Sequence, residues 1–223
     1  MQGFGAAMDY FFRVAINISD GLGVTVGLFA GTILLSLPLG LILSLGAISS
    51  YKILSWPVKF YVWLLRGTPL LLQLLFVYFG LPLIFGLNIE NFPAALIAFV
   101  LNYAAYFAEI FRAGIQSIDK GQFEAAKALG LSSAQSMWKI IIPQTVSRIL
   151  PPVGNEAITL VKDTSLVSII ALSDIMHQTR TIVMREASVS AFVVAAVFYL
   201  IMTFVLTRLF SYLEKRFSKS LLV

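Results

Sequence analysis

Several polar and ionisable residues lie deep inside long apolar stretches of this 223-residue sequence, where they have the chemistry to bind a solute. Asn102 and Tyr103 lie in the middle of the apolar stretch at 92–115, and Glu156 lies within the stretch at 146–161. A helix rises about 1.5 Å per residue, so these side chains lie roughly 15 Å from the ends of their helices. In a membrane that depth is near the midplane, where an ionisable side chain is a candidate for function.

The two stretches can bring their polar side chains together in one cavity. The candidate substrate-binding residues are Asn102, Tyr103, Tyr106, Asn155, Glu156 and Thr159. The Glu156 carboxylate favours a cationic group on the substrate, such as an amine. The alternative is that Glu156 makes a structural hydrogen bond to backbone opened by Pro151 and Pro152. His177 is the only histidine and has no cysteine or carboxylate cluster at ligand spacing, so no metal site is predicted.

Four further charged residues are candidates for a gate or for ion pairs. They are Arg66, Glu109, Lys162 and Asp163. Arg66 has the charge to receive a substrate carboxylate, but an ion pair with Glu109 is the favoured interpretation. Glu109 can also pair with Arg112, which follows it by one helical turn. Lys162 and Asp163 lie near a span boundary and are predicted to form a gate or a mutual ion pair.

The composition is that of a membrane protein. Only 12% of the residues are charged and 59% are hydrophobic, with a mean hydropathy of +0.90. A soluble domain has about 25% charged residues, so most side chains here must face lipid or each other. The net charge is +5, but the basic residues lie at the ends of apolar stretches, which argues against nucleic acid as a partner. The sequence has no cysteine, and hence no disulfide or thiol chemistry.

Five stretches approach the roughly 20 apolar residues that a membrane-spanning helix needs. They lie at about 20–52, 58–85, 92–115, 146–161 and 186–208. The second is interrupted only by Arg66, and the fourth is the weakest because it contains Pro151, Pro152 and Gly154. A shorter apolar segment at 165–171 is predicted to be a re-entrant or interfacial helix. We therefore expect an all-α transmembrane bundle of about five spans, forming a single domain over residues 1–223.

The distribution of lysine and arginine predicts how this bundle is oriented. Eleven of the 16 basic residues fall on one side if the polar loop at 116–148 is cytoplasmic. Basic residues collect on the cytoplasmic side of membrane proteins. The expected topology therefore has the N-terminus outside and the C-terminus inside.

The polar loop at 116–148 has a helix–turn–helix pattern. A short helix is predicted at 124–129 and is ended by Gly130, since glycine is the usual residue after a helix C-terminus. A second helix is predicted at 134–142 and is expected to end before Pro143. The two alanines after Glu124 are small enough to let a partner approach closely. An ordinary amphipathic connector is the alternative.

The spacing within this loop resembles the EAA loop of ABC importer membrane subunits. The sequence EAA stands at 124–126, followed after three residues by Gly130 and after nine more by IIIP at 140–143. Ile142 replaces the leucine usual in the family. The sequence RGTPLLLQ at 66–73, with NE at 155–156 and KDTSL at 162–166, resembles the polar amino acid permeases of that group. The three motifs occur in the right order, and the resemblance covers nearly the whole chain.

The resemblance implies a type I ABC importer permease in a bacterial plasma (inner) membrane, transporting polar amino acids. The residues implied to couple the loop to an ATPase are Glu124, Ala125, Ala126, Gly130 and Pro143. The implied partners are two ATPase subunits, a second permease chain (a homodimer is favoured) and an extracytoplasmic solute-binding protein. The chain lacks a GxxxxGK[ST] phosphate loop, so no cofactor is expected on it, and ATP and Mg would bind the ATPase. Because of Glu156, a basic amino acid is the favoured substrate.

Other classes of function remain as alternatives. The chain has the composition of a permease for another small polar solute, or of a stand-alone channel or secondary transporter. No internal repeat is visible, and the docking loop argues against a stand-alone transporter. An intramembrane enzyme would need paired catalytic residues, and no Ser/His, Asp/Asp or HExxH arrangement occurs.

Overall fold

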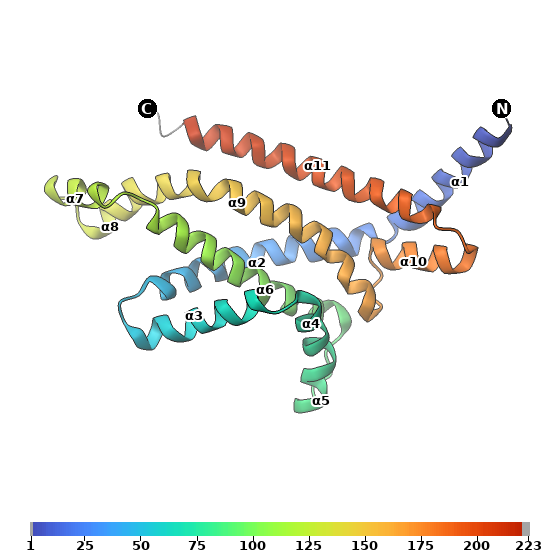
Figure 1. Ribbon diagram of the computed structural model, residues 1–223, viewed down its shortest axis with the longest axis horizontal. Helices are drawn as coiled ribbons and strands as arrows, with labels where there is room; N and C mark the ends of the chain where they lie inside the picture. Colours follow the sequence, from blue (N-terminus) through green and yellow to red (C-terminus); the bar gives the residue numbers. More distant parts are fainter. Residues whose placement is uncertain (1, 220–223) are drawn as a thin grey trace.

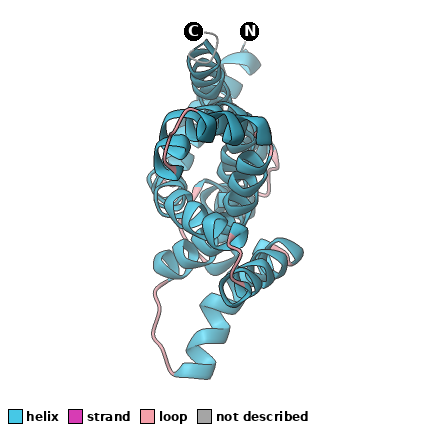
Figure 2. Ribbon diagram, turned by 90° about the vertical axis from the view of Figure 1, so that its left-hand side faces the viewer, coloured by secondary structure: helices cyan, strands magenta, loops and turns pink. Residues whose placement is uncertain are grey.

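The computed structural model describes residues 2–219, and side chains over residues 8–217. All regular elements in that range are helices joined by short connections (Figures 1 and 2). In chain order the elements are α1 (Gln2–Ser19), α2 (Leu22–Ile48), α3 (Lys52–Gly67), α4 (Leu70–Leu75), η1 (Phe76–Gly80), α5 (Leu81–Phe85), α6 (Asn91–Gln116), α7 (Lys120–Ala128), α8 (Ser133–Ser136), η2 (Met137–Ile141), α9 (Ile142–Asp163), η3 (Thr164–Ile170), α10 (Ile175–Glu186) and α11 (Ser190–Lys219).

Three of these helices are long and apolar enough to cross a membrane, namely α2, α6 and α11. A fourth candidate is the pair formed by α3 and the run from α4 to α5, taken as one broken span. These segments confirm an all-α transmembrane architecture. The predicted fourth span corresponds to α9, which has 22 residues but falls outside this apolar set. The total of five spans therefore stays a prediction.

The second predicted span is broken, which corrects the expectation of one continuous helix over 58–85. Helix α3 ends at Gly67 and α4 begins at Leu70, with a bend of 105° between them. The residue before a proline is pushed out of the helical conformation. Thr68 accordingly has φ −119° and ψ 146°, and Pro69 starts the new direction. In Figure 1, α4 and α5 turn away from the long helices at this point.

The fourth predicted span behaves in the opposite way. Helix α9 continues through Pro151 and Pro152 without interruption. The expected helix end before Pro143 is wrong, because η2 runs directly into α9 and Pro143 lies in the first turn of α9. The first turn tolerates proline because its N–H groups have no partner inside the helix.

Close packing of α2, α6, α9 and α11 builds the bundle. Helix α2 packs along α6, and α9 lies against both α6 and α11. At Gly40 of α2, an added Cβ would lie 2.7 Å from the Cβ of Phe107 on α6. At Gly154 of α9, it would lie 2.9 Å from Cγ of Phe210 on α11. Small residues thus bring these helices together, as is common in membrane bundles.

One end of the bundle is closed by α1, η3 and α10. The sequence analysis did not predict α1, which packs on α10 and α11 through buried Val14 and Ile18. The predicted short helix at 165–171 is a 3₁₀-helix, η3. Asp174 is fully buried and caps α10 by accepting hydrogen bonds from the backbone N–H groups of Met176 and His177. Burial raises the pKa of the Asp174 carboxyl to about 6.

The opposite end carries the polar loop. Figure 1 shows α7 and α8 at the end where α11 finishes, whereas α1 lies at the other end. Helix α7 begins four residues before its predicted start, and Asp119 caps it by accepting from the Gly121 N–H. Gly130 follows α7 with φ +73°, as expected for the glycine that ends this helix. Ser132 and Gln135 form a capping box at the start of α8.

Candidate functional site

A polar cavity of about 600 Å³ lies beside the break between α3 and α4. The break, α6 and α9 all contribute to its wall. The polar and charged side chains that line it are Arg66, Thr68, Asn102, Tyr103, Tyr106, Glu156, Thr159 and Asp163. Five of the six predicted substrate-binding residues therefore meet in one cavity, together with two of the four predicted gate or ion-pair residues.

Helix α9 presents its polar residues at helical spacing. Glu156, Thr159 and Asp163 are three and four residues apart, which places them on one face of the helix. Asn155 and Lys162 are exposed on α9 but do not line the cavity. The cavity thus receives two carboxylates from α9 and no lysine.

Arg66 projects toward the cavity from the end of α3. Its Nη1 lies 4.0 Å from Oε1 of Glu109, and its guanidinium carbon lies 5.4 Å from the centre of the Tyr106 ring. Glu109 is held more closely by Arg112, whose Nη2 and Nε donate to it at 2.6 and 2.8 Å. The two predicted pairs of Glu109 are thus present, and the pair with Arg112 is the tighter. Arg66 keeps 40% of its side chain exposed and is accessible to a ligand.

The two carboxylates of the cavity differ in their surroundings. The hydroxyl of Tyr103 donates to Oδ2 of Asp163 at 2.8 Å. In the described part of the chain, Asp163 forms no ion pair with Lys162, which was one of the two predicted roles of these residues, beside that of a gate. Glu156 is half-buried and has no hydrogen-bond partner among the described residues. The alternative role for Glu156, a bond to opened backbone, is not observed because α9 stays helical past Pro151 and Pro152.

Asn102 lines the cavity, but its amide is already engaged. Its Nδ2 donates to the backbone carbonyl of Leu65 at 3.2 Å and to Oε1 of Gln73 at 3.0 Å. Gln73 was not selected as a functional residue from the sequence. The available signal was a lone glutamine in an apolar run, four residues after Pro69.

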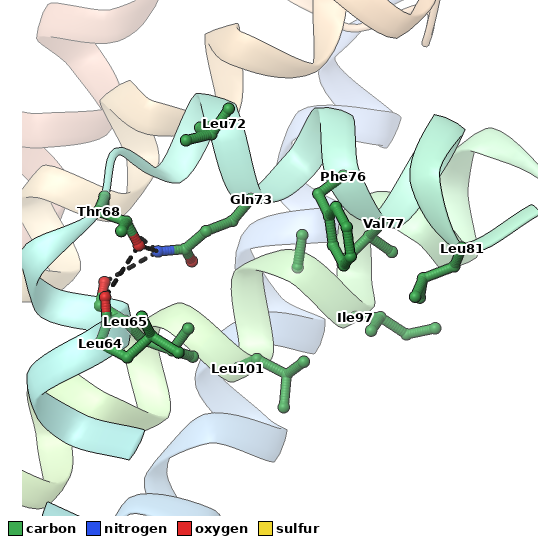
Figure 3. Close-up of a pocket in the computed structure, with 11 residues that line it drawn as sticks. Leu64, Leu65, Thr68, Leu72, Gln73, Phe76, Val77, Leu81, Ile97 and Leu101 are labelled. Carbon is green, nitrogen blue, oxygen red and sulfur yellow. Dashed lines mark hydrogen bonds between the residues drawn. The ribbon is translucent and has the colours of Figure 1, made fainter. Parts of the chain in front are cut away.

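A second cavity, of about 510 Å³, lies on the other side of the break and is almost entirely apolar (Figure 3). Leucine side chains from α3, α4 and α6 surround it, together with Phe76 and Ile97. Thr68 contributes to both cavities. The break therefore forms the wall between a polar and an apolar space.

The polar loop presents a mixed surface for a partner. Glu124, Ala125, Gly130 and Pro143 are exposed. Ala126 is fully buried within the chain and packs inside the loop. Leu129 and Trp138, which the sequence analysis did not select, expose 78% and 72% of their surface. They add apolar area to this end of the molecule.

No metal site is found in the part of the chain that the structure describes, since no three histidine, cysteine or acidic side chains converge there. The pairing of one guanidinium with two carboxylates suits an organic solute that carries both charges. Phosphate or nucleic acid would call for a surplus of basic groups.

Comparison with known proteins agrees with this geometry. Residues 9–219 match the family of binding-protein-dependent transport system inner membrane components. The arginine transport system permease protein ArtQ of Bacillus subtilis is 45% identical over 161 residues, which are 72% of this chain and 74% of that protein. The probable glutamine ABC transporter permease protein GlnM of Bacillus subtilis is 39% identical, over 83% of this chain and 86% of that protein.

Solved structures show the same architecture. A crystal structure of an amino acid ABC transporter with histidines has a TM-score of 0.85 at 37% identity, covering 95% of this chain and 97% of that one. The methionine ABC transporter MetNI in an inward-facing conformation has a TM-score of 0.70 at 17% identity, covering 95% and 98%. The second likeness concerns the fold alone. The chain therefore belongs to the family of binding-protein-dependent transport system inner membrane components, as an ABC importer permease for polar amino acids.

Proposed function

We propose that two copies of this chain form the translocation pathway of an ATP-driven importer, and that a basic amino acid is the favoured substrate. The observation that carries the proposal is the cavity that combines Arg66 with Glu156 and Asp163. Two separate ATPase subunits would bind ATP and Mg, and an extracytoplasmic solute-binding protein would deliver the substrate. The chain itself would conduct and couple, without enzymatic activity.

The charges of the cavity match an amino acid. Arg66 would receive the α-carboxylate, and Glu156, which lacks a partner among the described residues, would receive the α-ammonium group. Asp163 then remains for a positively charged side chain, with Tyr103 orienting its carboxylate. One carboxylate in excess of the guanidinium supports a basic amino acid over a neutral one. The relatives include one named for arginine and one named for glutamine, so they are compatible with either a basic or a neutral amino acid as the substrate.

Coupling would run through α9. The exposed face of the loop, with Glu124, Ala125 and Gly130, would dock on the ATPase. Helix α9 leaves this loop through η2 without a break and carries Glu156 and Asp163. Movement of the loop would therefore shift the cavity wall as one rigid element. ATP binding to the ATPase subunits would favour one of two orientations of α9 over the other. The cavity would then open to one side of the membrane at a time, which is alternating access.

The proposed topology has five spans in a bacterial inner membrane, with α9 as the fourth. The N-terminus would lie outside, and the loop and the C-terminus inside. Supporting this, the loop lies at the same end of the bundle as the end of α11 (Figure 1). Helix α9 needs little apolar surface because it packs between α6 and α11.

The substrate test uses Glu156→Gln in the importer reconstituted with its ATPase and binding protein in proteoliposomes. We expect uptake of L-arginine to fall at least about tenfold, since one charged hydrogen bond is worth about 1.5–3 kcal/mol. Uptake of L-glutamine should fall by a similar factor, because L-glutamine carries the same α-ammonium group, whereas Asp163→Asn should lower the uptake of L-arginine more than that of L-glutamine. Glu90→Gln, which alters an exposed carboxylate outside the cavity, is the matched control. Unchanged L-arginine uptake in Glu156→Gln contradicts the assigned role.

The coupling test uses the absence of native cysteine. Ala125→Cys should crosslink to single cysteines on the ATPase surface, because Ala125 is exposed. Ala126→Cys should not, because Ala126 is fully buried. Equal crosslinking at both positions, or at neither, contradicts the proposed docking face.

A further inference from the structure

The break between α3 and α4 leaves a backbone carbonyl without its helical partner. The carbonyl of Leu65 would normally accept from the N–H of the residue four positions on, which is Pro69 and has no N–H. An unpaired carbonyl in apolar surroundings is costly, and membrane-spanning segments must satisfy it internally. The structure therefore has to supply a donor from elsewhere.

Gln73, on the first turns of α4, supplies that donor. Its Nε2 donates to the carbonyl of Leu65 at 2.9 Å, to Oγ1 of Thr68 at 2.8 Å and to the carbonyl of Thr68 at 3.1 Å. Figure 3 shows the Gln73 side chain pointing back across the break toward Leu65 and Thr68, on the side of the apolar cavity. One side chain of α4 thus ties together both sides of the bend.

Asn102 completes the connection from α6. Its Nδ2 donates to Oε1 of Gln73 at 3.0 Å and to the same Leu65 carbonyl at 3.2 Å. We call Gln73 and Asn102 the amide clamp, since together they join α3, α4 and α6 at one carbonyl. Leucine side chains and Phe76 surround the clamp on one side, and hydrogen bonds are stronger away from water.

We propose that Gln73 is a positioning residue of the substrate cavity, which fixes the bend between α3 and α4 and thereby aims the guanidinium of Arg66 into the cavity. Arg66 directly follows Leu65, whose carbonyl both amides hold. From this anchored backbone its side chain reaches Tyr106 and Glu109. Gln73 does not line the polar cavity and so acts through Arg66. The proposal rests on the proposed function for the identity of the solute.

The first test measures the bend by hydrogen exchange of the assembled permease–ATPase complex in lipid nanodiscs. Gln73→Leu introduces an apolar side chain of similar size and removes the amide donor and acceptor. We expect the amides of residues 64–75 to exchange about tenfold faster, the effect of losing one buried hydrogen-bonding group. Leu72→Ala changes the neighbouring residue of α4, which is 57% exposed and has no hydrogen-bond donor in its side chain, and should leave exchange at 64–68 unchanged. Unaltered exchange in Gln73→Leu overturns the proposal.

The second test separates positioning from general support. Binding of radiolabelled L-arginine and L-glutamine is measured on the complex without its binding protein, in the wild type and in an Arg66→Ala background. Gln73→Leu should weaken binding about tenfold in the wild type and by less than about twofold when Arg66 is already absent. Equal weakening in both backgrounds overturns the positioning role.

The two tests also distinguish this proposal from the proposed function. If neither amino acid binds the wild-type complex, the assigned substrate class is contradicted, and the hydrogen exchange result alone decides whether Gln73 holds the break. If L-arginine binds the wild type and Gln73→Leu binds it equally well, only the positioning role is contradicted.

Discussion

Two proline-containing segments of this permease take opposite courses. Helix α9 contains Pro151 and Pro152 and runs unbroken over Ile142–Asp163, whereas the segment at 52–85 bends by 105° at Pro69. The number of prolines therefore does not decide where a helix breaks. The two segments differ in what happens to the carbonyls that each proline leaves without a donor.

At the bend, side chains donate to the carbonyl that Pro69 leaves without a donor and to the carbonyl before it. Gln73 and Asn102 donate to the carbonyl of Leu65, and Oγ1 of Thr68 donates to that of Leu64. Along α9, no side-chain donor to the carbonyls four residues before the two prolines is found among the side chains of residues 8–217. The bend is thus held by polar side chains that donate hydrogen bonds to the carbonyls it exposes. Without them, the helix keeps its direction.

The two courses serve different functions. The bend turns the backbone around Arg66 and Thr68 into one wall of the polar cavity. The unbroken α9 connects the polar loop rigidly to Glu156 and Asp163 on the opposite wall. In the proposed transport cycle, α9 would move against the fixed bend, and the predictions below test each wall separately.

The largest effect is expected from Asn102→Leu, which removes the α6 donor at the bend. The substitution leaves Oε1 of Gln73 without a donor and should lower the free energy of unfolding by about 1–3 kcal/mol. Unfolding in SDS, followed by circular dichroism, measures it. Asn155→Leu, an exposed asparagine on α9, is the matched control and should change stability by less than about 0.5 kcal/mol. Equal losses in the two variants would show that the bend has no special need for its donors.

A smaller effect is expected from Thr68→Val, which removes one hydroxyl at the bend and keeps the shape of the side chain. The hydroxyl donates to the Leu64 carbonyl at 2.9 Å and accepts from Gln73 at 2.8 Å. Its loss should cost about 1 kcal/mol in the same unfolding measurement. Thr159→Val, at a solvent-accessible position where α9 lines the polar cavity, is the control for stability only, and a loss there as large as at Thr68 would contradict the expectation.

The sequence predicted the general architecture and most of the cavity. Ionisable residues in apolar stretches are rare enough that Glu156 stands out, and helical spacing then groups it with Thr159. The EAA spacing placed the loop and its glycine correctly. These features depend on spacing within one segment, or on how deep a residue lies within its apolar stretch, so they can be predicted from the sequence directly.

The bend and its clamp were missed because they depend on contacts between distant residues. Gln73 and Asn102 are 29 residues apart, and Asn102 and Leu65 are 37 apart. The helix-breaking residues Gly67 and Pro69 at the bend are of the same types as those in α9, where the helix continues. The local sequence therefore did not distinguish the two segments. The burial of Ala126 was missed for a related reason, since it depends on how the loop folds back on itself.

The smallest effect, and the only one of opposite sign, is expected from Pro151→Ala in α9. Since α9 accommodates Pro151 without a break, alanine would regain only one backbone hydrogen bond, about 0.5–1.5 kcal/mol, and proline restricts the unfolded chain by about 0.4–1 kcal/mol, which offsets most of that gain. Because α9 already continues past Pro151, alanine restores an N–H donor without changing its direction. We expect the free energy of unfolding to rise by less than about 1 kcal/mol, with transport retained. A loss of more than 1 kcal/mol would mean that Pro151 shapes α9 after all, and that the rigid wall of the cavity is also built around its prolines.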